Sequence, residues 1–155
     1  MAYVSGDPPA IDGCLFCAIA AADNDDGDRV VERAEVTFTV LNRFPYSSGH
    51  LMVVPRRHAT AITELDSAEA AAVMRGASRA VQTLTRVLAP GGFNIGINQG
   101  AAAGASLDHF HMHVVPRWDG DTNFMPVLAD VKVLPEHLDT TALRLREAFA
   151  ELPGE

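Results

Sequence analysis

The sequence lacks any apolar run of the length that a membrane span requires, about 18 residues, and it contains only two cysteines. Residues 1–9 also lack the basic start and apolar stretch of a secretory signal. Both cysteines fall in Cys14-Leu15-Phe16-Cys17. In a reducing compartment such a pair is better suited to a metal or to redox chemistry than to a structural disulfide. We therefore expect a cytoplasmic protein with no membrane partner.

An excess of basic residues is also missing. The net charge is −8 and the calculated pI is about 5.1, which argues against a broad surface for a nucleic-acid polymer. A phosphorylated substrate would have to be held by a few local groups. With 155 residues, 48% of them hydrophobic and no internal repeat or linker, the chain is long enough for one sizeable core. We expect a single domain over residues 1–155.

Local patterns indicate an α+β fold with a mainly antiparallel sheet. Asp66 and Glu69 form a capping pair before a long Ala-rich segment, and Pro90-Gly91-Gly92 ends it. Residues 24–28 read as a solvated turn and residues 99–106 as a small-residue loop. We expect strands at residues 30–32, 37–41, 51–54, 93–98 and 109–115, and helices at 14–22, from 67 to about 88, and at 134–152.

Three histidines alternate with apolar residues in His109-Phe110-His111-Met112-His113-Val114-Val115. On a strand this spacing turns the apolar side chains toward the core and lines the imidazoles along the other face, about 7 Å from one to the next. A single half-buried histidine is usually structural. Three in register favour a function, in which an imidazole is a nucleophile, an acid, a base or a metal ligand.

With its companion motifs, this segment resembles the histidine triad family. The seven-residue signature matches without exception, and the likeness extends over about residues 14–128 through the Cys14/Cys17 pair, the turn from Asn42 to His50 and the loop from Asn98 to Ser106. The residues beyond this core, about 134–152, would add a C-terminal helical extension. The resemblance implies an α+β nucleotide hydrolase or transferase, usually a homodimer.

The segment after the triad, Pro116-Arg117-Trp118 and residues 120–124, looks like the diadenosine tetraphosphate phosphorylase-like branch. Other branches commonly carry a glutamine where this chain has Ala105, so any role of that glutamine toward the leaving group or water does not carry over. We therefore expect cleavage of dinucleoside polyphosphates with phosphate or water as acceptor, and adenine nucleotides as substrates.

By the resemblance, His111 is the nucleophile that forms a nucleotidyl-histidine, and a backbone carbonyl is expected to hold its other ring nitrogen. His113 would contact the phosphate or protonate the leaving oxygen, and His50 and His109 would support the triad. Asn42 matches the ribose position and Asn98 a phosphate or sugar position. Ser106 and the backbone at Gly104 and Ala105 would donate to the phosphoryl oxygens. Phe16, Ile19 and Leu41 are candidates for the base pocket.

The family and its galactose-1-phosphate relatives also suggest a structural zinc. Its ligands would be Cys14, Cys17, His58 and His109, a closed set that leaves no position for a metal-bound water. No organic cofactor is expected, and His137 lies apart from these motifs.

Other functions are compatible with the same residues. The first is hydrolysis of AMP-linked small molecules such as phosphoramidates or adenylylated adducts, against which Ala105 argues. The second is a metal-dependent hydrolase with the metal on His109, His111 and His113. The third is a nucleotide-binding module that grips phosphate without turnover.

Overall fold

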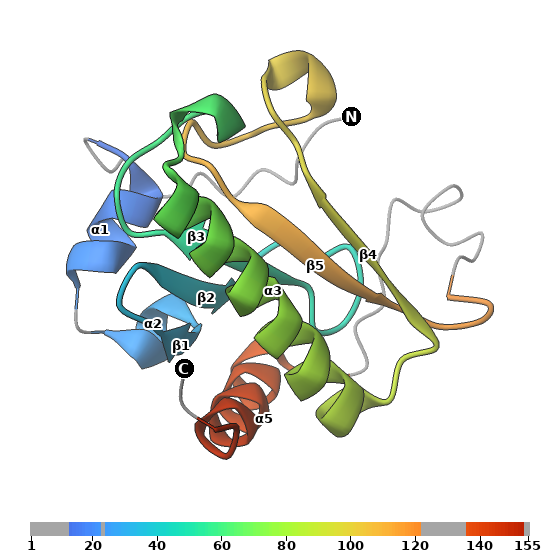
Figure 1. Ribbon diagram of the computed structural model, residues 1–155. Helices are drawn as coiled ribbons and strands as arrows, with labels where there is room; N and C mark the ends of the chain where they lie inside the picture. The colour runs from blue at the N-terminus through green and yellow to red at the C-terminus, as the bar shows by residue number, and fades with distance from the viewer. Residues whose placement is uncertain (1–12, 23, 122–135, 154–155) are drawn as a thin grey trace.

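The computed structural model describes residues 13–22, 24–121 and 136–153. Its centre is a single antiparallel sheet with the strand order β1-β2-β3-β5-β4 (Figure 1). The first three strands form a meander, and the last two are joined through the loop that leads to the histidines. The strands are β1 (Val30–Arg33), β2 (Thr37–Leu41), β3 (Leu51–Pro55), β4 (Gly92–Ile97) and β5 (Met112–Arg117).

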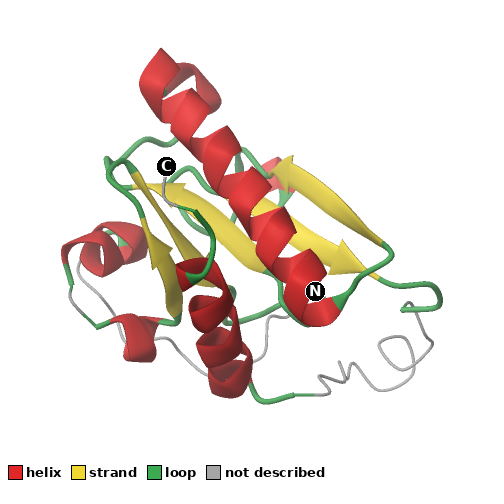
Figure 2. Cartoon of the chain, turned by 60° about the horizontal axis from the view of Figure 1, so that its bottom comes forward, coloured by secondary structure: helices red, strands yellow, loops and turns green. Residues whose placement is uncertain are grey.

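Helices cover the sheet unequally. The long helix α3 lies across one face and α5 packs beside it, whereas the short α1 and α2 lie toward the β1 side (Figures 1 and 2). The helices are α1 (Leu15–Ala21), α2 (Asp25–Asp28), α3 (Ser67–Leu88) and α5 (Leu138–Ala150), with one-turn 3-10 helices at Ile62–Glu64 and Ala101–Ala103. The expected α+β fold, with one long helix and a C-terminal helix, is confirmed. No helix in the described ranges combines the length and apolar character needed to span a membrane.

Strands β1, β2 and β3 divide their side chains between two apolar clusters. Leu51 and Val53 of β3 pack with Phe110, Met112 and Val114 against α3 and α5. The alternate residues Met52 and Val54 pack with Phe16 and Ile19 of α1 on the opposite face. Because Met52 is paired with His113, the histidines share the α1 face. The predicted alternation is therefore correct.

Helix α3 begins as the sequence predicts. The Asp66 carboxylate accepts a hydrogen bond from the Glu69 amide at 2.8 Å, and the Glu69 carboxylate accepts one from the Asp66 amide at 3.0 Å, a complete capping box. Glu69 also accepts two hydrogen bonds from the Arg57 guanidinium, at 2.7 and 2.6 Å. The start of the helix is thus tied to the segment that carries His58.

Three local expectations need correction. Residues 25–28 form a turn of helix rather than a loop, with the Asn24 side chain accepting from the Gly27 amide, while the acidic run stays accessible to solvent as expected. The histidine strand begins at Met112 and not at residue 109, since the Phe110 amide donates to the Ala59 carbonyl at 2.6 Å instead of joining the ladder. Helix α5 begins at Leu138, and residues 122–135, which include part of the segment after the triad and residues 134–135 of the expected helix, lie outside the described residues.

Candidate active site and metal centre

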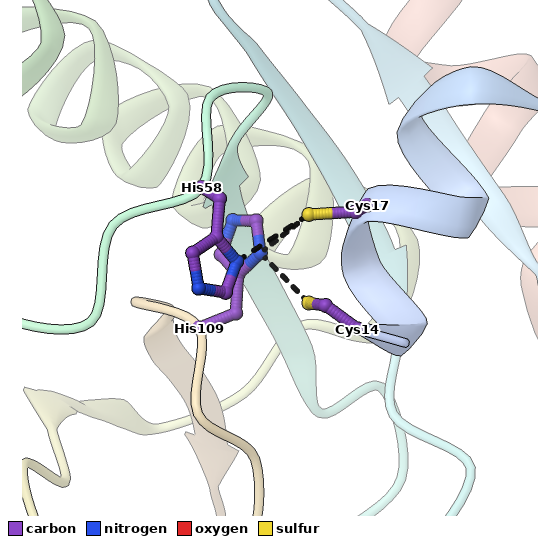
Figure 3. A group of neighbouring side chains, drawn as sticks. All are labelled: Cys14, Cys17, His58 and His109. Atoms are coloured by element: carbon purple, nitrogen blue, oxygen red, sulfur yellow. Dashed lines mark hydrogen bonds between the residues drawn. The ribbon is translucent and has the colours of Figure 1, made fainter. Parts of the chain in front are cut away.

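Four side chains from distant parts of the sequence converge at one end of the sheet (Figure 3). Cys14 and Cys17 come from α1 and the residue that caps it, His58 from the loop after β3, and His109 from the approach to β5. Their potential ligand atoms all lie within 4.8 Å of one another. These are the four residues that the resemblance implies for zinc, and the structure brings all of them together.

The distances in this cluster suit a tetrahedral metal. The Nδ1 atom of His109 lies 3.1 Å from Cys14 Sγ and 3.6 Å from Cys17 Sγ, and His58 Nδ1 lies 3.4 Å from Cys17 Sγ. Ligands on a zinc ion with bonds of about 2.0–2.3 Å lie roughly 3.3–3.8 Å apart. Two sulfur and two imidazole ligands form a common structural zinc set, so these residues fit the ion. Both cysteines are free of disulfides.

A main-chain carbonyl orients His109 for this role. Its Nε2 lies 3.0 Å from the Pro55 carbonyl oxygen, which can only accept, so Nε2 carries the proton. The lone pair is therefore on Nδ1, the atom that faces the two sulfurs. A backbone acceptor behind a metal-binding histidine is the usual way of fixing its tautomer.

His111 has the opposite tautomer. Its Nδ1 donates to the carbonyl oxygen of His109 at 2.7 Å, the kind of backbone partner that we expected. The lone pair is consequently on Nε2. The ring also packs against Phe16, with centroids 5.3 Å apart. The imidazole is thus held in one orientation with a nucleophilic nitrogen at its far end.

His113 is coupled to His50. The two imidazoles meet at 2.9 Å between His50 Nε2 and His113 Nδ1. The Tyr46 backbone amide donates to His50 Nδ1 at 3.0 Å, and Asn42 Nδ2 lies 3.3 Å from the same atom. Because His50 Nδ1 accepts, the proton of neutral His50 is on Nε2 and is donated to His113 Nδ1. Neutral His113 therefore carries its own proton on Nε2, which is buried without a protein partner among the described residues.

Burial keeps the triad uncharged. It lowers the pKa of His109 and of His111 below the usual value, although the hydrogen bonds to Pro55 and His109 oppose this. Burial, followed by the neighbouring His111, lowers the pKa of His113 to about 4. At neutral pH all three rings are neutral, as a metal ligand, a nucleophile and a hydrogen-bond donor require.

The loop after β4 contains most of the predicted substrate-binding residues. Asn98, Ala105 and Ser106 line a cavity of about 280 Å³ together with Thr60 and His109. Gly104 lies beside Asn98, because a Cβ at Gly104 would be 3.8 Å from Asn98 Nδ2. Asn42 lies elsewhere, next to His50, and its Oδ1 accepts from the Phe44 amide at 2.9 Å. A contact of Asn42 with ribose remains a prediction.

The structure also changes the candidate base pocket. Phe16 and Ile19 lie in the cluster under α1, but Leu41 faces α3 on the opposite side of the sheet, so the three cannot line one pocket. This prediction was wrong because side chains alternate along β2, so that Leu41 points to the opposite face of the sheet from Phe38 and Val40.

Sequence reasoning missed two further residues. Tyr46 stacks on the His50–His113 pair, and Gln99 accepts from the Ile62 amide at 2.8 Å, which ties the loop after β4 to the segment that carries His58. Neither belongs to a periodic pattern, and both contacts join segments whose proximity only the fold reveals.

The chain is similar to known proteins in both sequence and fold. The sequence profile of the HIT domain matches residues 24–120. The chain is 41% identical over 131 residues to a protein of Mycobacterium tuberculosis named AP-4-A phosphorylase, covering 84% of this chain and 67% of that protein. It is 30% identical over 106 residues to the adenosine 5'-monophosphoramidase of Schizosaccharomyces pombe, covering 67% and 74%. The fold matches the crystal structure of a Zn-bound histidine triad family protein from Mycobacterium smegmatis with a TM-score of 0.73 and 28% identity, over 90% of this chain and 94% of that one. Both named relatives are enzymes.

Proposed function

This chain belongs to the histidine triad family, and on that premise we propose that it cleaves dinucleoside polyphosphates, with diadenosine tetraphosphate as the model substrate. The observation that carries the proposal is the His111 imidazole, whose Nδ1–H is fixed on a carbonyl and whose Nε2 keeps a lone pair. The similarity to a protein named AP-4-A phosphorylase supports this substrate class. Inorganic phosphate is the proposed acceptor.

In the first step, the lone pair of His111 Nε2 attacks the α-phosphorus. A nitrogen–phosphorus bond forms, the bond from phosphorus to the bridging oxygen breaks, and that electron pair leaves with ATP. His113 donates from Nε2–H to the phosphoryl or bridging oxygen, a role open to its buried and unpartnered nitrogen. The departing polyphosphate is a stable anion. A hydrogen bond from His113 is therefore enough to assist its departure, and complete transfer of a proton is not required.

In the second step, a phosphate oxygen attacks the adenylylated phosphorus. The nitrogen–phosphorus bond breaks, its electron pair returns to His111 Nε2, and ADP is released while the proton of the phosphate passes to solvent. Ser106 and the backbone of Gly104 and Ala105 would donate to the phosphoryl oxygens, with Asn98 at the entrance of the same loop. Support for this assignment comes from the cavity that Asn98, Ala105 and Ser106 line together.

We also propose that Cys14, Cys17, His58 and His109 hold a structural zinc ion. Such an ion would cross-link α1, the loop after β3 and the approach to β5, and it would supply stability rather than chemistry. Within this arrangement, His109 orients His111 through its carbonyl oxygen. A catalytic metal shared by all three triad histidines is disfavoured, because both ring nitrogens of His109 are engaged, Nε2 with the Pro55 carbonyl and Nδ1 with the two cysteine sulfurs.

The chain's assembly and surroundings follow as further proposals. β4 lies at the edge of the sheet, and its residues Asn94, Ile95 and Gly96 are exposed, which suits pairing with a second copy in a homodimer. Light scattering should give twice the mass of one chain, and a mass near that of one chain would refute the dimer. We also propose one domain over residues 1–155 and, from the free cysteine pair, a cytoplasmic location.

A second candidate function is hydrolysis of AMP-linked small molecules. The phosphoramidase relative supports it, since the same adenylyl-histidine would form and water would resolve it. Ala105, which replaces the glutamine found in other branches, favours the phosphorylase.

Product analysis tests the proposal. The protein is incubated with diadenosine tetraphosphate, with and without inorganic phosphate, beside His111→Asn and a control, His137→Asn, whose side chain is 76% exposed. ADP plus ATP that form only with phosphate, in the wild type and the control but not in His111→Asn, would support the phosphorylase. AMP plus ATP without phosphate would make water the acceptor. Absence of turnover, with cleavage of phosphoramidates instead, would contradict the proposal.

A further inference from the structure

Tyr46 lies over the His50–His113 pair. Its ring centroid is 4.6 Å from that of His50 and 5.8 Å from that of His113, with interplanar angles of 38° and 29°. The two imidazoles are 0% and 8% exposed, whereas Tyr46 is 47% exposed. The tyrosine ring is therefore on the solvent side of the pair, and its inner face covers both imidazoles at once.

The backbone of Tyr46 acts on the same pair. Its amide donates to His50 Nδ1, which places the proton of His50 on Nε2 and directs it to His113 Nδ1. The surrounding turn is fixed at both ends, since the Asn42 amide donates to the His50 carbonyl at 2.9 Å and Ser47 Oγ donates to the Pro116 carbonyl at 2.7 Å. The position of Tyr46 is thus determined by the turn and by β5, independently of any substrate.

We propose that Tyr46 is a positioning residue for the reaction: its ring and its amide together hold the His50–His113 pair dry and in the tautomer that presents His113 Nε2–H to the substrate. This inference rests on the proposed function for its catalytic consequence, but the state of His113 can be measured without substrate. The ring excludes water, which would otherwise compete for the hydrogen bond between the two imidazoles. In this role Tyr46 acts through His50 and His113 and not on the substrate directly.

The surroundings of His113 make this testable. Among the described residues, the titratable side chains in ring contact with His113 are His50 from the turn, Tyr46, and His111 from the approach to β5. Burial is the largest cause that lowers the pKa of His113. Removal of the Tyr46 ring should therefore raise this pKa toward the usual histidine value, whereas loss of the hydroxyl alone should not.

The experiment compares wild type with Tyr46→Ala, Tyr46→Leu and Tyr46→Phe, and uses Phe44→Ala as a matched control. Phe44 is on the same turn, is 48% exposed and packs its ring under the Arg43 guanidinium. The pKa of His113 is measured by NMR in the free protein, and kcat and KM as functions of pH. We expect Tyr46→Ala to raise the pKa by at least one unit and to lower kcat roughly ten- to a hundredfold with little change in KM. Tyr46→Phe and Phe44→Ala should stay within about twofold of wild type in kcat, with the His113 pKa unchanged.

Three results would overturn the inference. The pKa of His113 and kcat could both be unchanged in Tyr46→Ala. Tyr46→Phe could lose as much as Tyr46→Ala, which would assign the effect to the hydroxyl. The loss could instead fall on KM alone, which would make Tyr46 a substrate contact. If Tyr46→Ala does not fold, Tyr46→Leu, which keeps apolar cover without a flat ring, should show an intermediate pKa and kcat. If none of the proteins turns over the nucleotide, the proposed function fails, while the NMR pKa still decides the role of Tyr46.

Discussion

His109 and His111 are two residues apart, yet main-chain hydrogen bonds leave the lone pair on different ring nitrogens. In His109 the Pro55 carbonyl holds Nε2–H and frees Nδ1 for the cysteine pair. In His111 the carbonyl of His109 holds Nδ1–H and frees Nε2. The segment that leads into β5 thus offers the proposed metal ligand and the proposed nucleophile from the same residue type, because each carbonyl selects a tautomer.

The lowered pKa of His113 makes stability depend on pH. The folded protein binds this proton with a pKa of about 4, whereas the unfolded chain binds it near 6.5. The unfolded state therefore takes up more protons between these values, so stability is complete above pH 6.5 and falls as the pH drops toward 4. The contribution is on the order of 3 kcal/mol. We expect the free energy of unfolding from urea titrations, at matched zinc content, to decline across this window less steeply in His113→Gln than in wild type.

If the two proteins lose stability in parallel from pH 6.5 to 4, burial of neutral His113 is not the cause. Glu69, whose pKa is also strongly lowered, does not titrate across this window. Hydrogen bonds from Arg57 lower its pKa to about 2, so its contribution is present above the usual carboxyl range and is lost only below it.

At the scale of elements, the close packing of α3 on β3 fixes the position of the strand that pairs with the histidine strand β5. Gly76 of α3 makes this approach possible, because a Cβ there would lie 2.7 Å from Val53 Cγ1. Val53 is fully buried and belongs to the central strand β3, which pairs with β5 at Met112 and His113.

The change Gly76→Ala should destabilise the protein. The added methyl overpacks the core, which typically costs about 1–3 kcal/mol. Replacing glycine by alanine in a helix gains roughly 1 kcal/mol in helix propensity, so a packing cost in the upper part of its range leaves the protein less stable. Ser78→Ala, on the exposed side of the same helix, is the control and should change stability by no more than about 0.5 kcal/mol. Thermal unfolding of both variants gives the comparison, and a more stable Gly76→Ala protein would show that Val53 moves aside without cost.

The elements that the sequence predicts well are those with local signals. The capping pair at Asp66 and the stop at Pro90 define α3, and alternation gives the strands within one or two residues. The start of β5 was misplaced, because Ala59 draws the Phe110 amide out of the ladder. The meeting of His50 and His113, 63 residues apart, depends on the pairing of β3 with β5 and has no local signal.

For the whole molecule, the proposed zinc ion would add a cross-link among α1, the loop after β3 and the approach to β5, which already touch through the Phe110–Ala59 hydrogen bond and the packing of Phe16 on His109. The residues came from the family resemblance, and the structure gathers all four, although their tautomers could not be read from the sequence. The short helix α1 alone supplies little hydrophobic stabilisation, and the ion would add stability in its place.

Removal of the metal should therefore reduce stability before it affects chemistry. Protein purified without chelator should contain about one zinc per chain, and chelation should lower the unfolding temperature, with activity declining as the structure loosens. Cys17→Ser should reproduce the loss of stability. Cys17 has no assigned part in the reaction, so this change leaves the His111 nucleophile in place. Far less than one zinc per chain would contradict the assignment.

The central claim is that His111 carries the nucleotide covalently. The direct measurement is the intact mass of the protein quenched in denaturant after it is mixed with diadenosine tetraphosphate in the absence of phosphate. The account predicts a species heavier by one adenylyl group, localised to His111, absent from His111→Asn, and discharged as ADP when phosphate is added. Turnover at the full rate with no such species, or an equal adduct on His111→Asn, would contradict it.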